Sequence, residues 1–489
     1  MARAQQIESS KARSSRREFL CRSGSGLGGL ALAHLLAGSG VIRPASGAGR
    51  GALDANDPHH APRAKSIIWL FMEGGPSHID LFDPKPELER LAGEVTPASF
   101  GLPVTSATGS HRMPLMPSVR EWQQHGQSGL WVSDWYPHIA EHVDDLAVIR
   151  SCHSDGVNHV GAIRQMNTGS ILAGRPSLGA WATYGLGSLN KELPAFVVLT
   201  DNKPVRGGPT NWSSGFLPAT YQGTLFRREG PPILDLEPPT GVTDRQQRSR
   251  LDLLNSLNRH HADRWPSDDE IEARIETYEL AYRMQQAAPR ATDLAAESEA
   301  TKSLYGMDEE ETATFGRNCL LARRLVERGV RFVEAYCGSG IAWDAHSKLE
   351  SNHTKWCKVS DKPIAGLLTD LKARGLLDDT LVVWGGEFGR TPFIDTNSIT
   401  GKVKEYGRDH NPWGFTIWMA GAGIPGGRVV GATDEIGFRA VDRPYHIHDI
   451  HATMLHMLGL DHMFLTHLHN GRAERATVNG GKLIEEVLV

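Results

Sequence analysis

Residues 66–80 read SIIWLFMEGGPSHID, and this stretch is the strongest indication of the fold. Its first part, from Ile67 to Met72, is a continuous apolar run, as expected of a strand buried on both faces of a sheet. Its second part turns polar, and the two glycines there allow the backbone to turn sharply beside a ligand. A buried strand that leads straight into ionisable side chains predicts a functional site at the strand's end.

Similar apolar runs recur along the chain, with helical patterns between them. The runs lie at 146–149, 195–199, 330–333, 380–384 and 415–419. Apolar residues with helical spacing mark segments 269–286, 312–328, 362–373 and 448–458. Buried strands that alternate with helices predict an α/β fold, with a mostly parallel central sheet and helices on both faces.

The segments that follow these runs are polar, and ligands in such sheets bind beyond the carboxyl ends of the strands. Carboxylates and imidazoles that converge there suit a divalent cation. A guanidinium pairs with two oxygens of an anion at once, which makes Arg390 and Arg408 candidate substrate-binding residues. The candidate metal ligands are Glu73, His78, Asp80, Asp344, His346, Glu387 and His410.

The loop after the run at 146–149 carries the candidate catalytic residues Ser154, Asp155 and His159. The loop leads into a helix start, which favours an anion such as phosphate or sulfate, and Asn158 is a candidate for holding the anionic oxygens. Ser154 needs a metal or a base for activation, and His153 and His159 are the candidates. Asp155 is a possible nucleophile, because carboxylates form acyl-phosphates, and it is equally a possible metal ligand.

Four motifs together resemble a known family. They are GGPSHIDLFDPKP at 74–86, GGEFGRTP at 385–392, RDH at 408–410 and HDIHAT at 448–453. On these motifs the sequence is identified as a member of the DUF1501 family of exported bacterial proteins, over roughly residues 62–480. That family is similar in fold to the alkaline phosphatase and sulfatase superfamily, whose members carry one or two metals at the strand ends.

The resemblance implies a metal-dependent hydrolase of phosphate or sulfate esters, with Zn, Ca or Mn as the divalent metal and an anionic ester as substrate. The chain departs from the superfamily's pattern, because Glu73, Asp155 and Phe388 stand where Asp, Thr and His ligands or nucleophiles are expected. His78, His159 or His446 could supply the missing ligand, or the site holds one metal or none. The alternative is a catalytically degenerate exported binding protein, for a polysaccharide or surface polymer, on the same fold. A formylglycine sulfatase is disfavoured, because Cys152 lacks the Cys/Ser-x-Pro-x-Arg context.

The N-terminus predicts export. Residues 15–20 (SRREFL) form a twin-arginine motif, followed by a mildly apolar run at 26–42 and small residues near 45–48. Residues 1–48 are therefore predicted to be a twin-arginine (Tat) signal peptide that directs the protein through the Tat translocon to the periplasm or beyond. The run is too short and glycine-rich for an integral membrane span.

The rest of the chain is predicted to hold a linker (49–61), one domain (62–480) with a polar helical insertion at about 226–311, and a C-terminal tail (481–489). Without the signal peptide, 45 basic residues face 55 acidic ones, which disfavours nucleic-acid binding. Five cysteines exclude a disulfide framework. Seven of the 22 histidines fall between His446 and His469. His446 and His448 could reach the site, whereas His456, His462, His467 and His469 are expected at the surface.

Overall fold

The computed structural model describes residues 53–489 except for 97–99, 101–113, 119, 202, 228–231, 235, 239, 263–268 and 396–404. The predicted signal peptide and the first part of the linker lie outside the described residues. Among the helices of the described part, none has the length and apolar character that a membrane crossing requires.

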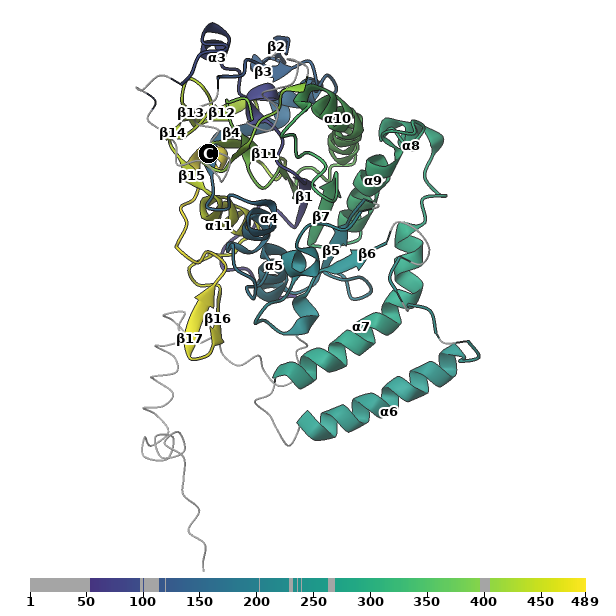
Figure 1. The fold of residues 1–489 in the computed structure, drawn as a ribbon. Helices are drawn as coiled ribbons and strands as arrows, with labels where there is room; N and C mark the ends of the chain where they lie inside the picture. Colours follow the sequence, from purple (N-terminus) through teal and green to yellow (C-terminus); the bar gives the residue numbers. More distant parts are fainter. Residues whose placement is uncertain are drawn as a thin grey trace, which may run out of the picture. The chain divides into compact units, whose positions relative to one another are not determined.

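The core of the domain is a nine-stranded sheet with β1 near its middle (Figure 1). The strand order is β12-β4-β11-β8-β1-β7-β5-β6, and β15 also pairs with β4. All neighbouring pairs are parallel except the two that β11 makes with β4 and β8, so the predicted mostly parallel sheet is confirmed. The strands are β1 (Ser66–Met72), β4 (Leu146–His153), β5 (Phe196–Leu199), β6 (Thr224–Phe226), β7 (Phe332–Cys337), β8 (Thr380–Gly385), β11 (Phe415–Ala420), β12 (Arg428–Val430) and β15 (Tyr445–His446).

Helices cover both faces of the sheet, as predicted (Figure 1). Odd-numbered residues of β1 pack in a core with α4 (His159–Thr168), α5 (Leu178–Leu186) and α11 (Ile447–Met457). Even-numbered residues pack in a second core with α7 (Asp269–Thr292), α9 (Ala313–Glu327) and α10 (Leu349–Ala373). Because every residue of β1 is buried, the strand needs apolar side chains on both faces, which explains its continuous apolar run.

The smaller elements surround these layers. They are α3 (Pro86–Arg90), α6 (Asp244–Ala262), α8 (Glu299–Leu304), β2 (Trp122–His125), β3 (Leu130–Ser133), β9 (Gly389–Arg390), β10 (His410–Asn411), β13 (Ala432–Thr433), β14 (Ala440–Asp442), β16 (Thr466–His469) and β17 (Arg472–Arg475). α10 begins at Leu349, well before the predicted start at residue 362. The helix continues through Pro363, although proline is typical of a first helical turn.

The polar segment 226–311 contains α6, α7 and α8, which fits the predicted helical character. Its second half is anchored to the domain, because Leu280, Met284 and Ala288 of α7 are buried in the core. The segment predicted as a C-terminal tail also packs against the domain. Its Ile484 and Val487 are fully buried beside α11.

Candidate metal centre

The site lies where the turns after β1, β7 and β8 meet the segment that enters β11. Because β11 runs antiparallel to β8, its beginning lies at the carboxyl ends of the parallel strands. The short strand β10, which precedes β11, pairs with β9, which follows β8, and this pairing sets His410 opposite Arg390. The strand order therefore brings together residues from distant parts of the chain.

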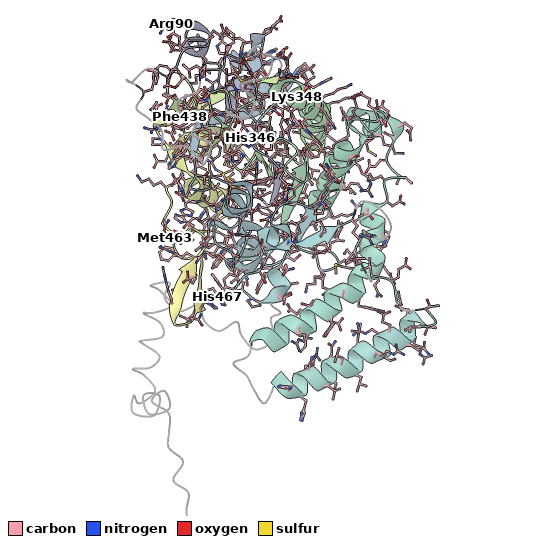
Figure 2. All side chains as sticks on the ribbon, in the orientation of Figure 1. Arg90, His346, Lys348, Phe438, Met463 and His467 are labelled. Atoms are coloured by element: carbon pink, nitrogen blue, oxygen red, sulfur yellow. The ribbon has the colours of Figure 1, made fainter. Side chains whose placement is uncertain are left out.

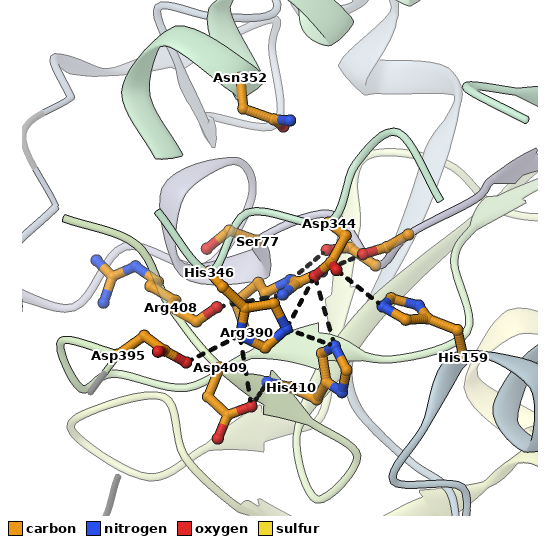
Figure 3. A network of polar contacts seen from close by, with 12 residues as sticks. Ser77, His159, Asp344, His346, Asn352, Arg390, Asp395, Arg408, Asp409 and His410 are labelled. Carbon is orange, nitrogen blue, oxygen red and sulfur yellow. Dashed lines mark hydrogen bonds and ion pairs between the residues drawn. The ribbon is translucent and has the colours of Figure 1, made fainter. Parts of the chain in front are cut away.

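Four side chains converge there: His159, Asp344, His346 and His410 (Figure 3). Each offers one ligand atom, and these atoms all lie within 4.8 Å of one another. Asp344 Oδ1 is 3.1 Å from His346 Nε2 and 3.4 Å from His410 Nε2, and Asp344 Oδ2 is 3.2 Å from His159 Nε2. All four are partly accessible to solvent. This four-residue cluster has the composition of a metal site.

A second layer of acceptors holds the outer nitrogen of each ring. Nδ1 lies 2.6 Å from Glu387 Oε1 in His159, 2.8 Å from Asp395 Oδ2 in His346, and 3.0 Å from the Val157 carbonyl in His410. Carboxylates and carbonyls accept, so each Nδ1 donates and each Nε2 is left to point into the cluster. Metal-ligating histidines almost always have this arrangement.

The charges within the four-residue cluster shift the pKa values of its members. Burial raises the pKa of Asp344, but the Arg390 guanidinium and the three imidazoles outweigh burial and hold this pKa far below its usual range. Burial lowers the pKa of His346, but hydrogen bonds to Asp344 and Asp395 raise it to about 9. Burial lowers the pKa of His410. Asp344 is therefore a permanent carboxylate, as a metal ligand must be.

Two glycines shape the turn that joins β1 to this site. Gly74 has φ +120°, and a Cβ atom there would lie 2.5 Å from the backbone nitrogen of Asp344. The Gly74 nitrogen donates to both carboxylate oxygens of Glu387, at 3.0 and 3.1 Å. The turn thus packs directly against the backbone that carries Asp344.

Glu73 and Glu387, two predicted ligands, lie at the strand ends but direct their oxygens elsewhere. Glu73 accepts hydrogen bonds from the backbone nitrogens of Arg206 (2.7 Å) and Gly340 (2.9 Å), and burial raises its pKa to about 7. Glu387 is fully buried and binds the Gly74 nitrogen and His159 Nδ1. Glu387 therefore holds His159, a member of the four-residue cluster, whereas Glu73 connects two loops.

His78, Asp80 and Arg408 are not brought to the four-residue cluster. His78 Nε2 lies 2.8 Å from the Gly437 carbonyl. Asp80 and Arg408 form a buried ion pair, with Nε 2.9 Å from Oδ2. Arg390 touches the cluster, but its guanidinium is fully buried and donates to Asp344 and to backbone carbonyls. Neither guanidinium is accessible to a substrate anion, because both side chains are fully buried.

The loop after β4 carries the other predicted residues. Ser154 is buried, and its hydroxyl has no hydrogen-bond partner among the described residues. Asp155 is 60% exposed at its side chain, and its Oδ2 is held by Gln165 Nε2 (2.5 Å) and His446 Nε2 (3.1 Å). Asn158 is the N-cap of α4, accepting from the Gly161 nitrogen at 3.1 Å. The capping places His159 at the first turn of α4.

Sequence reasoning missed Asp395 and Asp409 next to His346. Both are buried, and Asp409 Oδ1 lies 3.9 Å from His346 Nδ1 and accepts from the His410 nitrogen at 2.7 Å. Asp395 lies past the end of the Gly385–Pro392 motif, so its signal in the sequence is weak, whereas Asp409 stands inside the RDH motif beside the candidate His410.

The dense histidine run at 446–469 is not part of the four-residue cluster. His448 and His451 bind the carbonyls of Gly169 and Met166. His467 belongs to β16, far from His346 (Figure 2), and packs against Phe216 and Tyr184. These histidines connect helices and cover the core.

This geometry defines the class of protein: an α/β fold with a possible metal site at the carboxyl edge of its sheet. The chain belongs to the DUF1501 family, described as proteins of unknown function, whose model matches residues 64–488. This confirms the family predicted from the motifs. No curated protein matches the chain.

Several solved structures resemble the fold at low identity. The lipoteichoic acid synthase LtaP from Listeria monocytogenes is 9% identical, with a TM-score of 0.36 over 84% of this chain and 76% of that chain. The C-terminal periplasmic domain of EptC from Escherichia coli, in complex with Zn, is 10% identical, with a TM-score of 0.35 over 84% and 86%. Alkaline phosphatase from the Antarctic bacterium TAB5 is 10% identical, with a TM-score of 0.31 over 76% and 95%.

Proposed function

We propose that the protein is an exported metal-dependent hydrolase of phosphate or sulfate esters. The observation that carries the proposal is the four-residue cluster, in which three imidazole Nε2 atoms surround the carboxylate of Asp344. Lone pairs and a carboxylate that face one another repel unless protons or a cation lie between them. The acceptors behind each Nδ1 fix the rings in the orientation that a metal needs.

The donor set favours Zn or Mn over Ca. Three nitrogens and one carboxylate suit zinc and other transition metals. Calcium takes six to eight oxygen ligands, which the four-residue cluster does not offer. A bound metal would polarise an ester oxygen and lower the pKa of a nucleophile.

The loop 153–159 supplies the groups for the reaction. Asp155 offers an exposed carboxylate whose other oxygen is fixed by Gln165 and His446, and these contacts outweigh burial and lower its pKa. It is therefore ionised at neutral pH and suited to act as nucleophile or base. Backbone N–H groups at the N-terminal turn of α4, which Asn158 caps, would favour an anion in this region.

The export part of the proposal rests on the twin-arginine motif at residues 15–20, and transport through the Tat translocon to the periplasm or beyond follows from it. The route carries folded proteins, which allows the metal to be bound before export.

The second candidate function is an exported binding protein for a polysaccharide or surface polymer. The observation behind it is the full burial of Arg390 and Arg408, which removes the two predicted anion-binding cations from contact with an ester substrate and so weighs against hydrolysis. The burial of Ser154 points the same way, because a buried hydroxyl is a poor nucleophile.

Metal analysis of the native protein and an ester panel separate the two candidates. Purified protein should contain a divalent metal and hydrolyse aryl phosphate, phosphodiester or sulfate esters with Zn or Mn added. His346→Ala and His410→Ala should abolish both properties, whereas the remote His467→Ala should retain them. Absence of bound metal together with no hydrolysis across the panel rejects the enzyme, and binding to sulfated polysaccharides would then support the alternative.

A further inference from the structure

Arg390 contacts the four-residue cluster without being a possible metal ligand. Its Nη2 lies 2.8 Å from Asp344 Oδ1. Its other donors bind the carbonyls of Gly75 (2.8 Å), Arg408 (3.1 Å) and Gly74. The side chain is fully buried, and a guanidinium stays charged in proteins. The cluster therefore contains one fixed positive charge before any metal binds.

Phe388 closes the same side of the cluster. Its ring is stacked on the His410 ring at 4.4 Å and lies 5.2 Å from the His159 ring. Arg390 lies over the ring face at 5.8 Å. A Cβ atom on Gly75 would approach the ring to 2.6 Å, so the ring fits tightly against the turn after β1. An apolar ring fills the space next to two ligand histidines.

The neighbouring carboxylates are committed to other partners. Glu73 binds backbone nitrogens, and Glu387 binds the Gly74 nitrogen and His159 Nδ1. Asp395 and Asp409 lie on the outer side of His346, toward its Nδ1, and share only this histidine with the four-residue cluster. Among the described residues, Asp344 is thus the carboxylate that the four-residue cluster can offer to a cation.

We propose that Arg390 takes the place of a second cation, so that the site holds a single divalent metal ion. The inference rests on the proposed metal-dependent function and fixes the number of ions in it. A second divalent ion beside Asp344 would face the guanidinium at short range in a poorly solvated site, where like charges repel strongly. Arg390 also holds Asp344 Oδ1 in position, so we regard it as a positioning residue.

Metal counting on the full-length protein tests the proposal. After saturation with Mn²⁺ and removal of free metal, elemental analysis should give one ion per chain. Electron paramagnetic resonance should show the spectrum of an isolated Mn²⁺ ion. Two ions per chain with a spin-coupled spectrum would overturn this inference and leave the proposed metal-dependent function intact. No bound ion would overturn both.

A Phe388→His variant tests whether the charge of Arg390 sets the count. The variant adds an imidazole next to the cluster but keeps the guanidinium, so the count should stay at one. A rise to two ions per chain would show that the missing imidazole, and not Arg390, limits the number of bound ions. This result would contradict the role assigned to Arg390. The circular dichroism spectrum of the variant should match that of the unaltered protein. If the spectra differ, the number of metal ions bound by the unaltered protein decides the proposal.

Discussion

The orientation of each histidine in the four-residue cluster is set by the acceptor that binds its Nδ1. His159, His346 and His410 direct Nε2 inward because Glu387, Asp395 and the Val157 carbonyl accept from Nδ1. The hydrogen bond fixes both the ring orientation and the position of the ring proton.

Asp395→Asn should weaken metal binding about 10- to 100-fold, because the amide no longer fixes the Nδ1 proton and the orientation of His346. Isothermal titration with Zn²⁺ or Mn²⁺ measures the affinity. Asp57→Asn, at an exposed position outside the site, is the matched control and should bind as the unaltered protein does. Equal affinities for all three proteins would remove Asp395 from the site.

Glu334 should make the stability of the folded protein depend on pH, independently of the metal. It is buried on β7 and accepts from Tyr336 Oη at 2.5 Å, and burial raises its pKa to about 8 from an ordinary value of 4.5. The folded protein favours the neutral form of Glu334, so the contribution of this residue to the free energy of unfolding is fully present below pH 4.5. It is lost as the pH rises toward 8, because the unfolded chain ionises first.

Glu334→Gln keeps the acceptor and cannot ionise. Its stability relative to the unaltered protein should therefore increase between pH 5 and pH 8, by on the order of 2–4 kcal/mol in total. Urea denaturation at pH 5, 6.5 and 8 measures the difference, with the exposed Glu89→Gln as control. A difference that is constant over this pH range would contradict the assignment.

At the scale of elements, the turn after β1 and the direction of β11 build the site. The turn packs Gly74 against the backbone of Asp344 and Gly75 against Phe388, and the antiparallel β11 begins at the edge where the parallel strands end. β10 then pairs with β9 and sets His410 beside the ends of β7 and β8.

Gly74→Ala should destabilise the fold by more than about 2 kcal/mol and weaken metal binding, because its Cβ would collide with backbone nitrogens of Trp343 and Asp344 at 2.6 and 2.5 Å. Gly93→Ala is the matched control. Gly93 also has a positive φ (+79°), but nothing lies within 4 Å of its Cβ position, so only about 1–2 kcal/mol of backbone strain is expected. Urea denaturation and metal titration measure both effects, and similar losses in the two variants would argue against the close approach.

At the scale of the whole molecule, the site connects segments that are distant in sequence. The helix α4, the turn after β7 and the segment before β11 each supply members of the four-residue cluster. A metal that binds the folded chain and not the unfolded one stabilises all these connections at once.

Removal of the metal by a chelator should lower the thermal unfolding temperature by a few degrees. At a free metal concentration of 100 times Kd, binding contributes about 2.7 kcal/mol to the stability of the folded state. Differential scanning calorimetry with and without EDTA measures the change. The His346→Ala variant should unfold at the same temperature in both conditions, and an equal chelator effect on this variant would point to metal bound elsewhere.

The sequence alone determined the α/β class, the positions of the main strands and the family, and it named the members of the four-residue cluster as candidates. Continuous apolar runs such as Ile67–Met72 reflect burial on both faces, and that signal is local. Asp344, His346, His410 and His159 were all candidates, because each follows or precedes such a run closely.

The tertiary structure decided which candidates meet and which do not. Asp80 and Arg408 pair with each other because both are buried, and a buried charge needs a partner. Arg390 turns toward Asp344 and backbone carbonyls instead of the solvent. Asp395 enters the site through the fold of its loop. These outcomes depend on strand direction and on burial, which bring together residues that are far apart in the chain, and no local pattern encodes them.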